Sequence, residues 1–191
     1  MFYSALVTYG HEFQHVLRKY QLKNGIIDIK LLIIALEELN IELDKSFYLA
    51  NYRKLFSEID AEKAGIKVTY NFLKKYNISL LNGNYKEFYK YMLDKSKFDI
   101  SLFFTNDEIL NYVYFLITNV KDLLPSSLDL LDEIPILKCI FHNDGSIVKI
   151  EELKERLISS KLNITSKDDV ELFYSVLYKC LERLYSSNKK I

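Results

Sequence analysis

Apolar residues recur along most of this chain at intervals of three and four, which is the spacing of amphipathic helices. The pattern predicts helices over roughly 2–21, 30–40, 45–59, 69–76, 85–95, 106–119, 136–141, 150–160 and 167–186. Only five Gly and two Pro interrupt the 191 residues, and these two residue types are the strongest helix breakers. We therefore expect an all-α fold of about 8–10 helices.

Two stretches of the chain share one order of features: a turn, a short β-rich run, a helix and a Leu-Asn-Ile sequence. The turns and the Leu-Asn-Ile sequences lie at Asn24-Gly25 and 39–41 in the first stretch and at Asp144-Gly145 and 162–164 in the second. This order is similar to a helix-turn-helix. We predict that residues 12–60 and 137–185 form two similar three-helix units.

The positions of Gly, Pro and other loop-forming residues suggest three consecutive segments within one compact body. We expect an N-terminal helical unit over 1–80, a helical bridge over 81–125 and a C-terminal helical unit over 126–191. The last unit is winged-helix-like or EF-hand-like in shape, but no calcium is expected because the candidate loops lack oxygen ligands at required positions. Ala64-Gly65 reads as a break between helices, and Pro135 as a helix start or a kink.

The first helix is expected to bury its apolar side, which carries Phe13, Val16, Leu17 and Tyr20. A second local feature is the capping-box spacing of the residues around Asn106, a Thr followed three positions later by a Glu. This spacing predicts a well-defined start for the helix over 106–119.

The 26 basic and 26 acidic residues cancel, but they are unevenly placed. Residues 63–97 contain eight Lys and two acids, whereas residues 99–133 contain seven acids and one Lys. Such asymmetry is typical of a polyanion-binding face. The favoured interpretation is that the two segments pack on each other.

The sequence HEFQH at residues 11–15 resembles the H-E-x-x-H motif of zinc metalloproteases. In that motif two His one helical turn apart bind zinc and the Glu acts on the bound water. The resemblance implies that His11 and His15 are metal ligands, that Glu12 is catalytic and that zinc is the cofactor. His142, the only other histidine, is the candidate third ligand.

Other observations count against a zinc site. The motif has no strands upstream to hold a substrate, and no third-ligand signature of that family follows it. The favoured prediction is therefore no cofactor and two half-exposed histidines on one helix. We expect His142 to lie far from the first helix and no Asp or Glu of another helix to complete the site.

A Lys- and Tyr-rich tract over 67–97 is the candidate nucleic-acid interface. Lysines neutralise phosphates, and tyrosine rings stack on unpaired bases. The residues proposed for this role are Lys74, Lys75, Lys86, Tyr89, Lys90 and Tyr91. The first turn of the predicted last helix instead carries Asp168 and Asp169, which would repel phosphates. The C-terminal unit is therefore expected to bind protein rather than DNA.

Two cysteines, Cys139 and Cys180, lie in apolar helical surroundings without CxxC spacing, which favours buried, reduced thiols. No window of about eighteen apolar residues and no signal peptide is recognisable, so we expect a cytoplasmic protein without membrane contact.

The favoured function is a non-enzymatic interaction or adaptor protein that binds another protein or associates with itself. Small size without family motifs is typical of viral, mobile-element or defence-system proteins. We expect no enzyme, with a zinc-dependent hydrolase and a nucleic-acid-binding protein as the alternatives.

Overall fold

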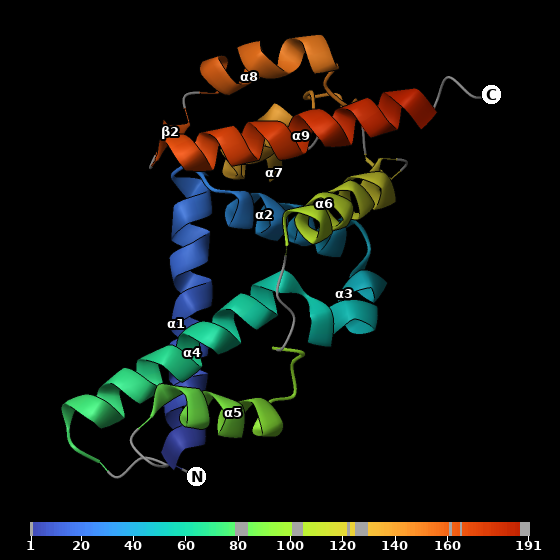
Figure 1. Cartoon of the computed structure of the whole chain (residues 1–191). Helices are drawn as coiled ribbons and strands as arrows, with labels where there is room; N and C mark the ends of the chain where they lie inside the picture. Colours follow the sequence, from blue (N-terminus) through green and yellow to red (C-terminus); the bar gives the residue numbers. More distant parts are fainter. Residues whose placement is uncertain are drawn as a thin grey trace. The chain divides into compact units, whose positions relative to one another are not determined.

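The structure is a computed structural model that describes residues 2–78, 84–100, 105–121, 123–124, 130–160, 162–164 and 166–187. These residues are mostly helical, so the predicted all-α class is confirmed (Figure 1). The helices are α1 (Phe2–Lys23), α2 (Ile29–Leu43), α3 (Lys45–Asn51), η1 (Tyr52–Lys54), α4 (Phe56–Lys75), α5 (Tyr85–Lys95), α6 (Asn106–Val120), α7 (Leu130–Glu133), η3 (Pro135–Cys139), η4 (Ile150–Glu152), α8 (Leu153–Ser159) and α9 (Lys167–Ser187). Within these ranges, no helix has the length and apolar character that a bilayer crossing requires.

The chain divides into two compact units that are each discontinuous in sequence. Unit 1 comprises Met1–Arg18 and Tyr48–Phe103, and unit 2 comprises Lys19–Phe47 and Phe104–Ile191. The sequence-based division differs, because it gives each unit one continuous segment. In the structure, helix α1 begins in unit 1 and ends in unit 2. The basic and acidic segments fall largely into different units, and their pairing stays a prediction.

Unit 1 is organised around the crossing of α1 and α4. A Cβ atom on Gly65 would lie 2.4 Å from the carbonyl oxygen of Val7, and a Cβ on Gly10 would lie 2.8 Å from the Cα of Gly65. Only glycine allows two backbones to approach this closely. Helix α4 runs through Gly65 without interruption, so the predicted break at Ala64-Gly65 is wrong: packing against α1 outweighs the low helix propensity of glycine.

The apolar core of unit 1 lies between α1, α4, α5 and the segment that follows α5. Its buried members are Val7, Ile66, Leu73, Phe88, Met92, Phe98 and Ile100. Helix α5 covers the predicted range of 85–95 and is capped by Asn84, whose side chain accepts a hydrogen bond from the backbone of Lys86. Parts of the bridge expected over 81–125, including its first three residues, lie outside the described residues.

Unit 2 is built around α2, which is apolar on nearly all sides and buried over most of its length. Such a helix must be covered from several directions, and it packs against α6, η3 and α9. Inside this core the Asn40 side chain donates hydrogen bonds to the carbonyls of Leu36 (2.7 Å) and Leu116 (3.1 Å) and accepts one from Asn119 (2.6 Å). Pro135 begins η3, as expected for a helix start.

A short parallel sheet pairs the two sequence segments of unit 2. Strand β1 (Ile26–Ile27) pairs with β2 (Asn163–Ile164), with Ile26 opposite Asn163 and Ile27 opposite Ile164. The Asn163 backbone N–H also donates to the carbonyl of Gly25 over 2.8 Å. The pairing links two segments that are far apart in the sequence.

The two stretches predicted to be similar differ in the order of their elements. In the first stretch the strand precedes helix α2, whereas in the second the strand β2 follows helix α8. Asn40 lies buried inside a helix, while Asn163 is exposed in a strand. The two Leu-Asn-Ile sequences are therefore not structural equivalents, because an identical tripeptide takes the conformation that its own tertiary contacts select.

Candidate metal centre

The close crossing of α1 and α4 brings the HEFQH sequence against two glutamates of α4. His11 is buried (7% exposed) and His15 is half-buried, one turn further along α1. Glu58 and Glu62 occupy positions one turn apart on α4. A pair of His and a pair of Glu, each at i and i+4, therefore face each other across the helix crossing.

Three side-chain atoms of this cluster form a compact triangle. The Nε2 atoms of His11 and His15 are 3.1 Å apart, and Glu58 Oε2 lies 3.3 Å from His11 Nε2 and 3.8 Å from His15 Nε2. Tetrahedral zinc with ligand bonds of about 2.0–2.2 Å has ligand atoms about 3.4 Å apart. The triangle thus has the size of one face of a zinc coordination tetrahedron. Among the described residues, these three alone form a group whose ligand atoms lie close enough together to hold a metal ion.

Glu62 contacts the other edge of the His11 ring. Its Oε2 atom lies 3.2 Å from His11 Nδ1, and its Oε1 atom accepts a hydrogen bond from Ser96 Oγ over 3.1 Å. A carboxylate accepts but cannot donate when ionised, so Nδ1 donates to Glu62 and Nε2, which also faces His15, donates to Glu58. Metal-ligating histidines in proteins usually have such an acceptor on their second nitrogen.

The protonation of the cluster follows from its two carboxylates. Burial lowers the pKa of His11, but hydrogen bonds and charge from Glu58 and Glu62 outweigh it and raise this pKa to about 9. Burial likewise raises the pKa of Glu58, whereas His11 and His15 lower it to about 2. Burial together with the charge of Glu58 raises the pKa of Tyr48 to about 12. Glu58 is therefore an anion across the physiological pH range.

Neighbouring contacts hold the cluster in place. Arg18 binds both carboxylate oxygens of Asp60, at 2.9 and 3.2 Å, and Gln14 donates to the same carboxylate over 2.8 Å. These bonds tie α1 to α4 at Asp60, which stands between Glu58 and Glu62 in the sequence. The His11 ring also stacks on Phe98, with centroids 5.3 Å apart.

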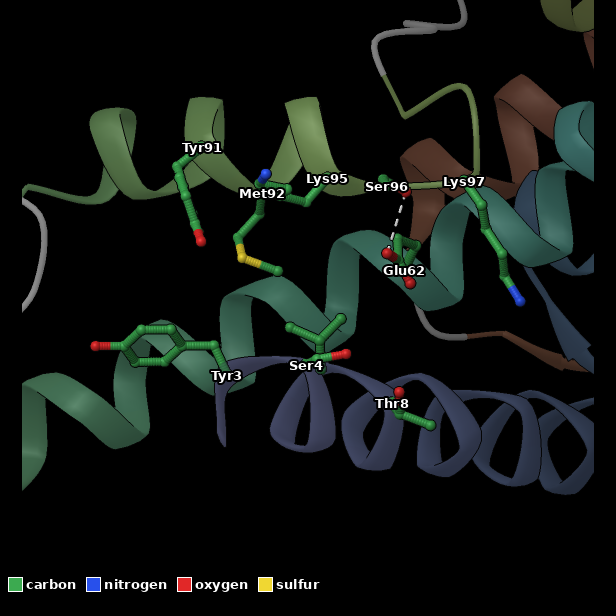
Figure 2. Close-up of a pocket in the computed structure, with 10 residues that line it drawn as sticks. Tyr3, Ser4, Thr8, Glu62, Tyr91, Met92, Lys95, Ser96 and Lys97 are labelled. Carbon is green, nitrogen blue, oxygen red and sulfur yellow. Dashed lines mark hydrogen bonds between the residues drawn. The ribbon is translucent and has the colours of Figure 1, made fainter. Parts of the chain in front are cut away.

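A cavity of about 480 Å³ opens beside Glu62 within unit 1. Figure 2 shows Thr8 of α1, Glu62 of α4 and Ser96 and Lys97 after α5 around it, with the hydrogen bond between Ser96 and Glu62 drawn as a dashed line. The carboxylate of Glu62 forms part of the wall. Glu62 therefore connects a solvent-accessible cavity to the buried ring of His11.

A glutamate of another helix lies beside the two histidines, and whether it completes a metal site stays a prediction. Glu58 is within 4 Å of both, because α4 continues past the predicted break and crosses α1 at Gly10. His15 is half-buried as expected, but His11 is buried.

The other two sequence candidates for this site have different surroundings. His142 belongs to unit 2, where its Nε2 lies 3.1 Å from Glu152 and its Nδ1 contacts Arg156. Arginine can only donate, so both ring nitrogens of His142 have partners in its own unit. Glu12 is exposed on α1, and among the described residues no contact ties it to the cluster.

The candidate nucleic-acid residues lie on α4 and α5 of unit 1. Lys74, Lys75, Lys86, Lys90 and Tyr91 are exposed, whereas Tyr89 is half-buried. The Tyr89 hydroxyl donates to the carbonyl of Ile100 over 3.1 Å, and its ring packs on Tyr85. Tyr85 and Tyr89 also line a cavity of about 410 Å³ together with Lys63 and Lys67. The lysines are accessible, but part of the tyrosine surface is used in packing.

The sequence contains a signal for Glu58 and Glu62 that the helix prediction missed. Their i, i+4 spacing matches that of the two histidines, but a predicted helix end near residue 59 separated them. Comparison with known proteins gives no match to any family model, curated protein or solved structure. The function therefore has to be argued from this geometry.

Proposed function

We propose that this chain is a zinc-binding protein with a hydrolase-type centre, in which His11, His15 and Glu58 are the metal ligands. The observation that carries the proposal is the triangle of 3.1, 3.3 and 3.8 Å between their three ligand atoms. This set of ligands reverses the order of the hypotheses drawn from the sequence, because Glu58 supplies the third ligand that the HEFQH motif lacked.

The chemistry of the donor atoms favours zinc over the hard cations. Two imidazole nitrogens and one carboxylate oxygen suit Zn²⁺, whereas Mg²⁺ and Ca²⁺ take oxygen ligands. Zinc would replace the proton between His11 Nε2 and Glu58. The proton on His11 Nδ1 would remain hydrogen-bonded to Glu62. The bound form would therefore keep the contact of His11 Nδ1 with Glu62.

Three protein ligands leave one position of a tetrahedral zinc for water. This composition is typical of catalytic rather than structural zinc sites, and it lowers the pKa of the bound water to about 7. Zinc held by His11, His15 and Glu58 would supply an activated water for the hydrolysis of esters, amides or phosphate esters. Glu12 as the general base stays a prediction from the motif.

Metal analysis of protein purified without a histidine tag tests the proposal. We expect about one zinc per chain, lost in His15→Ala and in Glu58→Ala. His142→Ala is the matched control and should keep its zinc, because His142 binds Glu152 and Arg156 instead. Absence of zinc from refolded wild-type protein supplied with Zn²⁺, or equal binding by Glu58→Ala, would overturn the assignment.

A hydrolysis assay then separates a catalytic from a structural ion. Zinc-loaded protein is tested on panels of activated esters, peptides and phosphate esters, with Glu12→Gln as the variant for the proposed base. We expect turnover that needs zinc and falls in Glu12→Gln without loss of metal. Bound zinc without turnover on any panel would reject the hydrolase and leave a structural zinc site.

The nucleic-acid alternative has one favourable observation, the exposed lysines that α4 and α5 carry together with a cavity lined by Lys63, Lys67, Tyr85 and Tyr89. Binding of labelled single strands should then fall steeply with salt. The double variant Lys86→Glu with Lys90→Glu should abolish it. Lack of binding even at low salt would reject this function.

A further inference from the structure

Helix α1 carries a row of large apolar side chains that are exposed. Tyr9 is 71% exposed, Phe13 57%, Val16 66%, Leu17 37% and Tyr20 65%. We refer to these five residues as the α1 stripe. The sequence pattern predicted that most of them form the buried side of the helix, and the structure places them on the opposite side.

The stripe is exposed because α1 packs on α4 with its polar side. His11, Gln14 and Arg18 contact acidic residues of α4. With 100° per residue, this polar side lies across the helix from Phe13 and Val16. Within the described residues, the polar face of α1 is thus buried and its apolar face exposed, which is the reverse of an ordinary amphipathic helix.

The spacing of the α1 stripe is that of the interface between two helices of a coiled coil. Tyr9, Phe13, Val16 and Tyr20 follow one another at intervals of four, three and four. This is the a/d pattern by which two helices interlock along their length. A partner of the same helical geometry fits it better than a flat surface does.

The area is sufficient for a weak specific dimer. Aromatic side chains bury about 150–250 Å² each. Two copies of the stripe, with three aromatics and two aliphatics in each, would cover on the order of 1,000 Å², which is the lower bound for a specific interface.

The charges beside the stripe select a second copy in antiparallel orientation. Glu12 and Lys19 are exposed and lie on the same edge of the stripe, one heptad apart. In an antiparallel pair, Phe13 of one copy lies against Val16 of the other, and Glu12 of each copy lies beside Lys19 of the other. A parallel pair would place Glu12 beside Leu17. We infer that the α1 stripe is a self-association surface on which a second copy of this chain docks antiparallel.

Sedimentation equilibrium of the full chain tests the association. We expect a concentration-dependent mass approaching twice that of the single chain. Phe13→Glu with Val16→Glu should be a monomer over the same range, and an unchanged circular dichroism spectrum would show that it folds. Leu49→Glu is the matched control, because Leu49 is 81% exposed on another helix and should leave the dimer intact.

Disulfide pairing tests the orientation. When Phe13→Cys and Val16→Cys proteins are mixed and oxidised, an antiparallel dimer gives mainly the mixed disulfide. Lys19→Glu should weaken the dimer, and adding Glu12→Lys to it should restore the affinity. A wild-type protein that stays monomeric, or disulfides mainly between identical positions, would overturn the inference. Neither result depends on whether the metal centre binds zinc.

Discussion

Gly10 of α1 and Gly65 of α4 meet where the two helices cross, so closely that a Cβ atom on Gly10 would lie 2.8 Å from the Cα of Gly65. The candidate metal centre lies beside this crossing, because His11 follows Gly10 directly and Glu62 precedes Gly65 by three residues.

Gly65→Ala should destabilise the protein although alanine is the better helix former. The added methyl meets the Val7 carbonyl at 2.4 Å, and such overpacking costs about 1–3 kcal/mol. Urea unfolding followed by circular dichroism measures the loss. Lys67→Ala is the control: it is exposed two residues along the same helix and should change stability by under about 0.5 kcal/mol. A stabilised Gly65→Ala variant would show that the helices are further apart.

Glu62→Ala should weaken zinc binding without removing a ligand. Loss of the acceptor on His11 Nδ1 leaves the ring free to rotate, and such changes cost about 10–100-fold in metal affinity. Competition with a chromophoric chelator measures the affinity. Glu62→Gln should restore most of it, because its amide oxygen still accepts from Nδ1. Equal affinities for wild type and Glu62→Ala would show that Glu62 only stabilises the fold.

Asn40→Leu should destabilise unit 2 by about 1–3 kcal/mol, because the buried carbonyl of Leu116 and the amide of Asn119 lose their partner. Asn40→Asp should cost more at neutral pH, since its carboxylate would face the carbonyls of Leu36 and Leu116. Burial raises the pKa of such a carboxyl, so this variant should recover stability as the pH falls. Thermal unfolding across pH 4 to 8 provides the measurement. Equal melting temperatures for wild type and Asn40→Leu would mean that Asn40 is hydrated.

Leu116→Ala and Leu177→Ala should each cost roughly 2–5 kcal/mol, since both side chains are fully buried in unit 2. Ile158→Ala serves as the control, because Ile158 is 74% exposed and its truncation should cost under about 0.5 kcal/mol. Chemical denaturation at one protein concentration compares the three. A loss below about 1 kcal/mol for either leucine would contradict its place in the core.

The two thiols should be unreactive in the folded protein. Burial raises the pKa of Cys139 to about 11 and that of Cys180 to about 12, and neither cysteine is in a disulfide. A thiol-specific chromogenic reagent at pH 8 should label neither until denaturant is added. Because both pKa values lie above the ordinary value of 9.0, the unfolded chain ionises first, and the two thiols contribute a loss of stability as the pH rises above that value. Rapid labelling of one thiol in buffer would show that its helix opens locally.

Features set by neighbouring residues could be predicted from the sequence. Thr105 and Glu108 form the predicted capping box, with Thr105 N–H donating to Glu108 over 2.7 Å. Helix α5 has the predicted bounds, and Cys139 and Cys180 are buried as expected. Each of these depends on contacts within a few turns or on composition alone.

The His–Glu cluster of the candidate metal centre could not be predicted, because it depends on which residues meet across α1 and α4. His11 and Glu58 are 47 positions apart, and nothing local shows that they touch. The sequence predicts a helix break at Gly65, although Gly65 and Gly10 together define a helix crossing. The apolar side of α1 was assigned to the core because amphipathic patterns ordinarily face inward, whereas here ionic and polar contacts occupy the inner side.

The division of unit 2 into two sequence segments has a consequence for synthesis on the ribosome. Strand β1 and helix α2 emerge early, but α6, α9 and strand β2, against which they pack, follow after the whole of unit 1. During that interval the apolar surface of α2 has no native cover, and exposed surface of this kind is what nascent chains bury in chaperones or in aggregates. Unit 1 has all its residues once the first 103 have been made, so the order of translation gives the candidate metal centre its residues before the larger unit can close.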